Sequence, residues 1–157
     1  MRKTLVVVIC ALGLASLAAA QTKLDSKWHC DKPTTQQKLD VGDTADHAYV
    51  IAQGNCTATS SSAGEKAGTY TEFQETWKSS FTNHGRLVVT MDNGDKTYYN
   101  YQGTGNPVKK SAMNKWKIGG GTGSHKTAAG SGSCEGKLAD DGSSDWTCTG
   151  SAPAAAK

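Results

Sequence analysis

Short runs of alternating residues, separated by clusters of turn-forming residues, constrain the fold of this chain more than any other feature. Clusters of Gly, Asn, Asp, Ser and Thr interrupt the chain about every eight to twelve residues, and apolar residues between them stand singly or alternate. No stretch after residue 20 has the period of an amphipathic helix. The pattern predicts an all-β sandwich or barrel with strands at 48–52, 69–79, 86–91, 96–102, 115–119, 132–138 and 144–150.

The first twenty residues have the pattern of a secretory signal peptide. Arg2 and Lys3 precede an apolar run at 5–17, and three alanines at 18–20 supply the small residues of a cleavage site. The run is too short for a stable membrane anchor, and no second apolar stretch follows it. We therefore expect cleavage after Ala20, a secreted or periplasmic product, one β-barrel domain at 21–150 and a disordered tail at 151–157.

The charge balance excludes one large class of partners. Removing residues 1–20 takes away Arg2 and Lys3, which lowers the formal net charge from +3 to +1. A nucleic-acid-binding domain usually carries a strong excess of basic residues, so no nucleic-acid partner is expected. No membrane span is expected either.

Cysteine number and context predict disulfides. The chain has five cysteines, and Cys10 lies within the predicted signal peptide. The other four, Cys30, Cys56, Cys134 and Cys148, are an even number in an exported chain, which is typical of two disulfides. Three pairings of these four residues are open on number alone.

The turn at 140–142 favours one pairing. Asp140-Asp141-Gly142 is typical of a three-residue hairpin loop whose glycine is left-handed. The residues equidistant from Asp141 then pair, which places Cys134 directly opposite Cys148, within disulfide range. This register predicts Cys134–Cys148 and leaves Cys30–Cys56.

A second turn, Asp92-Asn93-Gly94, has the same chemistry. A two-residue turn here would set apolar residues opposite polar ones, whereas a three-residue bulged loop sets Val89 opposite Thr97 and Leu87 opposite Tyr99. Since a slip of one residue turns every side chain to the other face, the apolar pattern favours the bulged loop.

Motifs for cofactors are weak. The glycine-rich run at 118–123 does not complete a phosphate-binding motif, and we interpret it as a kink at a barrel corner. Aspartates at 140–145 and 92–95 lack the spacing of a calcium loop, and the four histidines are scattered. Neither a metal nor an organic cofactor is expected.

The strand predicted at 69–79 holds the main candidate for chemistry. Phe73, Glu75 and Trp77 share one of its faces, and the two large apolar side chains predict that this face points inward. Glu75 would then be desolvated and could serve as an acid–base group or a ligand anchor. The alternative is an ion pair between Glu75 and Arg86 near the barrel mouth.

The segment 116–126, Trp-Lys-Ile-Gly-Gly-Gly-Thr-Gly-Ser-His-Lys, followed by Ala129-Gly130-Ser131-Gly132, resembles the barrel family of allene oxide cyclases and plant dirigent proteins. Gly94-Asp95-Lys96 and the segment 101–105 resemble small secreted bacterial members, although His125 stands where an aromatic residue is commoner. The resemblance spans residues 68–150 and implies a closed antiparallel barrel of about eight strands with an apolar cavity. It also implies a homo-oligomer, a trimer in better-known members. None of the family's catalytic residues can be matched here.

These observations favour a secreted, disulfide-linked barrel that binds a small hydrophobic molecule without catalysis of its own. One alternative is an isomerase or cyclase-type enzyme that steers a hydrophobic substrate with Glu75. Another is a structural or surface-interaction protein with a solid barrel. The candidate ligand-binding residues are Phe73, Glu75, Trp77, Val89, Tyr99 and Trp116.

Overall fold

The computed structural model describes residues 21–153, which form nine β-strands and one short 3-10 helix. The predicted signal peptide at 1–20 lies outside the described residues. The elements are β1 (Gln21–Cys30), β2 (Thr35–Asp40), β3 (Ala48–Ser61), β4 (Glu65–Trp77), β5 (Ser80–Met91), β6 (Lys96–Asn106), β7 (Ser111–Gly121), the 3-10 helix η1 (Gly123–His125), β8 (Ser131–Leu138) and β9 (Ser144–Pro153).

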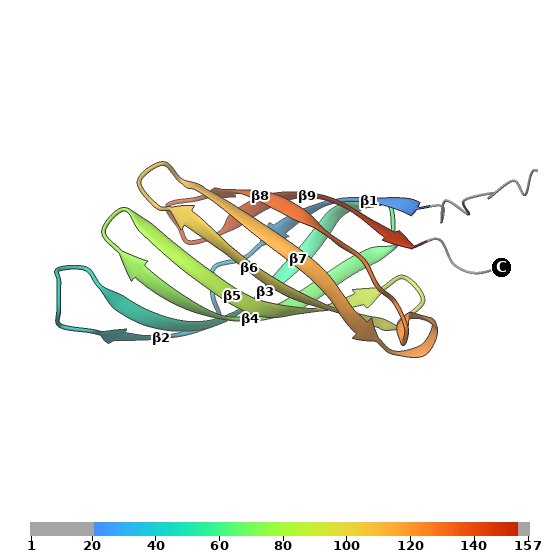
Figure 1. Cartoon of the computed structure of the whole chain (residues 1–157), viewed down its shortest axis with the longest axis horizontal. Helices are drawn as coiled ribbons and strands as arrows, with labels where there is room; N and C mark the ends of the chain where they lie inside the picture. Colours follow the sequence, from blue (N-terminus) through green and yellow to red (C-terminus); the bar gives the residue numbers. More distant parts are fainter. Residues whose placement is uncertain (1–20, 154–157) are drawn as a thin grey trace, which may run out of the picture.

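The strands form a closed antiparallel barrel with one additional strand (Figure 1). The sheet order is β1-β9-β8-β7-β6-β5-β4-β3-β2, and β1 also pairs with β3, which closes eight strands into a barrel. The second half of β3 pairs with β1, while its first half pairs with β2. The β2–β3 hairpin therefore extends beyond one end of the barrel, opposite the end where β1 begins (Figure 1).

Both predicted hairpin registers are confirmed. Leu87 pairs with Tyr99 and Val89 with Thr97 across β5 and β6, and Gly94 has a φ of 85°. In the β8–β9 hairpin, Cys134 pairs with Cys148 and Gly142 has a φ of 88°. Both disulfides are formed as predicted, Cys30–Cys56 and Cys134–Cys148. The first joins β1 to β3, and the second joins β8 to β9.

Several strand bounds differ from the sequence prediction. The segment 57–68, which lies between two predicted strands, is itself mostly in strands, because β3 continues to Ser61 and β4 begins at Glu65. Strands β1 and β2 were not predicted, and β9 continues to Pro153, three residues into the expected tail. These segments carry few large apolar residues, but main-chain pairing with their neighbours holds them in the sheet.

Inside the barrel, large side chains lie opposite glycines on neighbouring strands. A Cβ at Gly54 would lie 2.6 Å from the Tyr70 hydroxyl oxygen, and one at Gly136 would lie 2.6 Å from Cζ3 of Trp146. Many interior positions therefore have no side chain of their own. The interior is shared between a few aromatic rings and the space that glycines leave for them.

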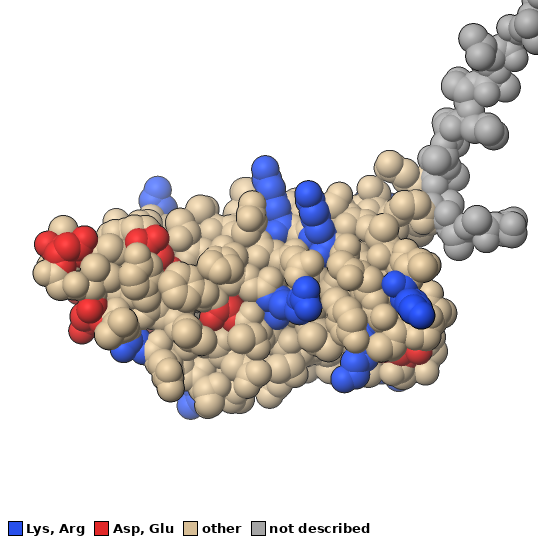
Figure 2. Space-filling view, turned by 60° about the horizontal axis from the view of Figure 1, so that its bottom comes forward, with Lys and Arg blue, Asp and Glu red and all other residues tan. Residues whose placement is uncertain are grey.

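The outer surface carries no concentrated basic region on the face in view. Figure 2 shows lysine and arginine side chains spread singly over that face, while acidic side chains gather at the end where Figure 1 places the β2–β3 connection. No helix within residues 21–153 is long and apolar enough to cross a membrane.

Candidate ligand cavity

The barrel interior holds a cavity of about 580 Å³. Ligand pockets of proteins commonly enclose about 300–1,000 Å³, so the space is large enough for a small organic molecule. Every barrel strand contributes to the lining, and Gln36 of β2 borders it as well. Turn residues of the β6–β7 and β8–β9 connections, among them Pro107 and Gly142, surround one end.

Aromatic rings make up much of the cavity wall. Six inward-facing aromatic residues line it from five of the barrel strands: Trp28, Tyr70, Tyr99, Tyr101, Trp116 and Trp146. Tyr99 and Trp116 meet edge to face, with ring centroids 5.5 Å apart and an interplanar angle of 78°. This geometry fixes both rings and leaves a rigid apolar surface.

Acidic residues also line the cavity, and two of them, Glu65 and Glu72, each accept a hydrogen bond from a tyrosine. Glu72 Oε2 accepts hydrogen bonds from Tyr101 Oη at 3.0 Å and Asn83 Nδ2 at 3.1 Å, while Gln74 Nε2 donates to Glu72 Oε1 at 2.5 Å. Glu65 Oε1 accepts a hydrogen bond from Tyr99 Oη at 2.6 Å. Three donors therefore hold the Glu72 carboxylate in one position.

The tyrosines near these carboxylates remain neutral donors. Burial raises the pKa of Tyr99 and of Tyr101 well above the usual value, and the charges of Glu65 and Glu72, respectively, raise them further. Burial, with a smaller contribution from Glu72, raises the pKa of Tyr70 to about 12. At neutral pH these hydroxyl groups therefore stay protonated.

Three polar atoms on the cavity wall have no hydrogen-bond partner among the described residues: Asn83 Oδ1, Asn114 Oδ1 and Trp116 Nε1. The three residues are 7–8% exposed. Buried polar groups in folded proteins nearly always find a partner, so each of these atoms is a candidate contact for a bound molecule. Asn83 and Asn114 lie in one interior row and flank Gly103, which has no side chain to separate them.

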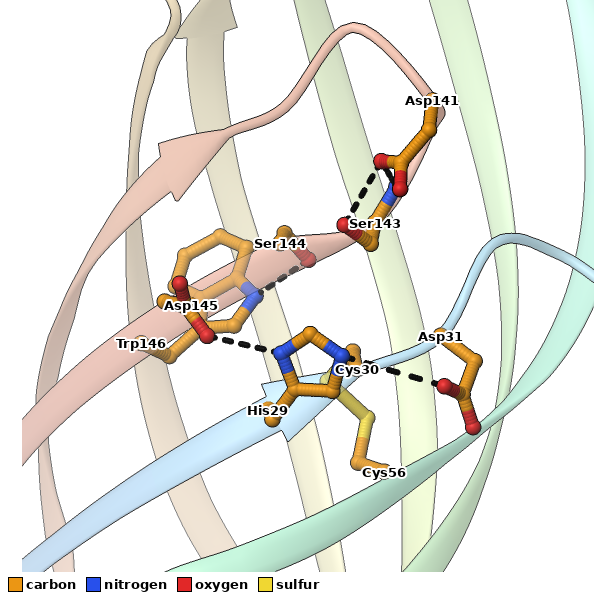
Figure 3. Close-up of polar contacts among 9 residues, drawn as sticks. All are labelled: His29, Cys30, Asp31, Cys56, Asp141, Ser143, Ser144, Asp145 and Trp146. Carbon is orange, nitrogen blue, oxygen red and sulfur yellow. Dashed lines mark hydrogen bonds and ion pairs between the residues drawn. A yellow bond between two sulfur atoms is a disulfide. The ribbon is translucent and has the colours of Figure 1, made fainter.

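The cavity end near the β8–β9 turn is stabilised by contacts between β1 and β9 (Figure 3). His29 Nδ1 lies 2.8 Å from Asp145 Oδ1, and the hydrogen bond to Asp145 raises the pKa of His29. Trp146 Nε1 donates to Ser144 Oγ at 2.9 Å. The Cys30–Cys56 disulfide lies beside this cluster and lines the cavity.

The prediction that Phe73 and Glu75 of β4 point into the barrel is wrong. Glu75 and Phe73 pair with Tyr49 and Ile51 of β3, which are 36% and 54% exposed, and neither Glu75 nor Phe73 lines the cavity. The inward face is instead the alternate set that includes Tyr70 and Glu72. The two aromatic residues misled the prediction because they pack with other side chains on the outer surface.

Glu75 takes part in a polar cluster on that outer face. His47 Nε2 lies 3.0 Å from Glu75 Oε1, and His47 Nδ1 lies 2.6 Å from Asp43 Oδ1. The His47 ring stacks on Trp77 with centroids 5.2 Å apart. Glu75 thus pairs with His47 of the β2–β3 connection and not with Arg86. The Nε of Arg86 instead donates to Asn100 Oδ1 at 3.1 Å.

The other predicted ligand-binding residues divide into two groups. Tyr99 and Trp116 line the cavity wall, and Trp77, the last residue of β4, borders the cavity's end while its ring also stacks on His47. Val89 is completely buried in the core and does not line the cavity. Sequence reasoning missed Glu65, Glu72, Asn83, Asn114 and the remaining aromatic residues. The sequence holds only an indirect signal for Glu72, because Lys78-Ser79 is not a typical turn sequence. With the two-residue turn that the structure shows there, Tyr70 pairs with Leu87, which the sequence places on the same face as Tyr99.

No group of three histidine, cysteine, aspartate or glutamate side chains suited to a metal ion is found within residues 21–153.

The fold is a dirigent-like β-barrel, as comparison with solved structures shows. The structure of the pterocarpan synthase dirigent protein GePTS1 superposes with a TM-score of 0.52 at 14% sequence identity, covering 96% of this chain and 98% of that chain. At this identity the similarity establishes the fold alone. No protein-family model matches the sequence, and no curated protein matches it.

Proposed function

We propose that this protein binds a small, largely apolar molecule inside its barrel and does not itself catalyse a reaction. The observation that carries the proposal is the interior cavity of about 580 Å³ walled by aromatic rings. A structural protein with a solid barrel would fill this space with side chains, as eight-stranded barrels of the smallest interior do. Buried polar atoms without partners provide fixed points for orienting a ligand.

The state of Glu72 favours binding over catalysis. An acid–base group must reach the proton that it transfers. Both oxygens of Glu72 are already occupied by donors from Gln74, Asn83 and Tyr101. Glu75, the earlier candidate for an isomerase or cyclase, lies on the outer face. Glu72 therefore acts as part of the wall.

We propose further that the protein is exported. Two disulfides fit an oxidising compartment, since such bonds seldom persist in the cytosol. An exported binding protein meets its ligand outside the cytosol, where a rigid, cross-linked barrel resists unfolding.

Fluorescence titration tests the binding proposal. The neutral dye 6-propionyl-2-dimethylaminonaphthalene should show a blue-shifted, enhanced emission with a dissociation constant on the order of 10 µM. The Leu87→Trp substitution places a larger ring on the cavity wall and should weaken binding at least about tenfold. Val88→Trp, one residue along on the same strand, is the matched control and should bind as the unmodified protein does.

Circular dichroism should show that both variants remain folded. Equal binding by Leu87→Trp and Val88→Trp, or no dye binding by the unmodified protein, would contradict the proposed function.

A further inference from the structure

Acidic side chains outnumber basic ones among the residues that line the cavity. Glu65, Glu72 and Asp25 line it, and among the described lining residues Lys110 is the single basic side chain. Lys110 belongs to the β6–β7 turn, and its Nζ lies 2.6 Å from Asp140 Oδ2 of the β8–β9 turn. This lysine is therefore paired at the cavity's end and does not balance the two interior glutamates. Inside a barrel, where screening by salt is weak, such an excess repels anions and attracts cations.

The aromatic wall strengthens the preference for a cation. The faces of Trp, Tyr and Phe rings carry negative charge density, and a cation within about 6 Å of a ring centroid is attracted by it. Glu72, Gly85, Tyr101 and Trp116 follow one another in a single cross-strand row from β4 to β7, and Tyr101 reaches Glu72 across the glycine. Aromatic faces combined with a carboxylate are the usual composition of a site for an organic ammonium group.

The amide oxygen of Asn83 has no hydrogen-bond partner among the described residues and therefore favours a ligand that carries a hydrogen-bond donor. Asn83 Nδ2 donates to Glu72 Oε2, which fixes the orientation of the amide and leaves Oδ1 as the free acceptor. Asn83 is 7% exposed and lines the cavity. A ligand that donates an N–H to this oxygen would also lie close to the Glu72 carboxylate. Asn114 Oδ1, two strands away and roughly 10 Å across the sheet, offers a second acceptor.

From these observations we propose that the ligand class of the cavity is arylalkylamines, which carry an aromatic ring on an alkyl chain, in their protonated form. The ammonium group donates to Asn83 Oδ1 beside Glu72, and the ring packs against the tryptophans and tyrosines of the wall. This assignment rests on the proposed function and narrows it. A carboxylate ligand would meet Glu65 and Glu72 as like charges. A hydrocarbon would leave the buried amide oxygens without partners, which costs binding free energy.

Three probes with one ring system and different head groups test the assignment: 2-(2-naphthyl)ethylammonium, 2-(2-naphthyl)ethanol and 3-(2-naphthyl)propanoate. Isothermal titration calorimetry at neutral pH should find the ammonium compound bound at least about tenfold more tightly than the alcohol. The propanoate should bind more weakly than either. Because the three share their apolar body, the ratios report the head group alone.

Two isosteric substitutions on the same strand locate the effect. Glu72→Gln removes the interior charge and should reduce the preference for ammonium over alcohol to within about threefold. Glu75→Gln makes the same chemical change on the outer face and should leave the preference unchanged. Should Glu72→Gln fail to fold, the ratios in the unmodified protein decide the question.

The outcomes separate this inference from the proposed function. Binding of the neutral dye without tighter binding of the ammonium compound would overturn the ligand class and leave the cavity's function standing. A Glu72→Gln variant that still prefers the ammonium compound to the alcohol would overturn the ligand class as well. If neither the dye nor any naphthyl probe binds, the proposed function fails and the ligand class fails with it.

Discussion

Glycines determine where interior side chains can lie in this barrel. At Gly85 on β5, an added Cβ would lie 2.6 Å from the Thr71 carbonyl oxygen and 2.7 Å from the Tyr101 hydroxyl oxygen. Gly85 pairs with Glu72 on one side and with Tyr101 on the other. The missing side chain therefore creates the space in which Tyr101 reaches Glu72.

Replacing Gly85 by alanine should destabilise the protein and disturb the cavity. A main-chain oxygen cannot yield as a flexible side chain can, so we expect a loss of about 1–3 kcal/mol in the free energy of unfolding. Urea denaturation measures this loss. Thr82→Ala, at an exposed position of the same strand, is the control and should change stability by less than about 0.5 kcal/mol. Equal stability of Gly85→Ala and the unmodified protein would show that the strand pair can move apart freely.

His47 makes stability depend on pH. Its hydrogen bond to Asp43, and to a smaller extent the one to Glu75, raises the pKa of His47 above the usual value for histidine. The same bond to His47 lowers the pKa of Asp43. A raised folded-state pKa means that the folded protein binds more protons than the unfolded chain near neutrality. The stabilisation is complete below the unfolded pKa of about 6.5 and disappears as pH rises through the folded pKa.

The Tm should accordingly fall as pH rises from about 6 to 8. His47→Gln should flatten part of this slope. His29→Gln should remove the remainder, because the hydrogen bond to Asp145 raises the pKa of His29. Differential scanning fluorimetry of both single variants and the double variant measures the slopes. A double variant with the full slope would contradict the assignment to these two histidines.

At the scale of elements, the sequence predicted hairpins better than strand faces. The loops at 92–94 and 140–142 contain glycines that must be left-handed, and each loop type permits one register. The Cys134–Cys148 pairing followed from that register. Strand β4 has no such marker, since Lys78-Ser79 is not a typical turn sequence, and its face was assigned from Phe73 and Trp77 alone.

That assignment failed for a physical reason. Size usually indicates burial, but β4 carries aromatic residues on both faces: Tyr70 inside and Phe73 outside. The outer ring packs between Tyr49 and His84, with centroids 5.3 Å and 5.4 Å away. The cavity residues could not be predicted singly because glycines on neighbouring strands, rather than local apolarity, create their space.

The two disulfides should differ in what they protect. By loop-closure entropy each contributes roughly 3–3.5 kcal/mol to stability, because the sequence separations, 26 and 14 residues, are similar on a logarithmic scale. Cys30–Cys56 joins β1 to β3, where the barrel closes with an irregular register, whereas Cys134–Cys148 lies in a tight hairpin.

Hydrogen exchange of two double variants tests this difference. Cys30→Ala with Cys56→Ala should speed exchange of the amides that pair β1 with β3, around Trp28. Cys134→Ala with Cys148→Ala is the matched control and should leave those amides protected. Equal exchange at the β1–β3 pair in both variants would contradict a special role for the first disulfide in closing the barrel.

At the scale of the whole molecule, closure depends on β1. This strand pairs with β9 over its full length and with β3 over its second half, so it completes the ring of eight strands. Its first residue, Gln21, directly follows the predicted cleavage site at Ala20 and pairs with Pro153. A mature chain beginning at Gln21 would retain every described residue of this closing strand.

Expression of the full-length chain in a host with a secretory pathway should therefore yield an exported protein whose first residue is Gln21. Removal of the apolar segment at 5–17 allows a soluble product, and the oxidising compartment allows both disulfides to form. Intact-mass spectrometry, before and after reduction, should give the mass of residues 21–157 and a gain of four hydrogens. Replacing Ala18 and Ala20 by large residues should retain the precursor and reduce export, since signal cleavage requires small side chains at these positions. An exported protein that keeps Met1, or a precursor that is cleaved within β1, would contradict this expected maturation.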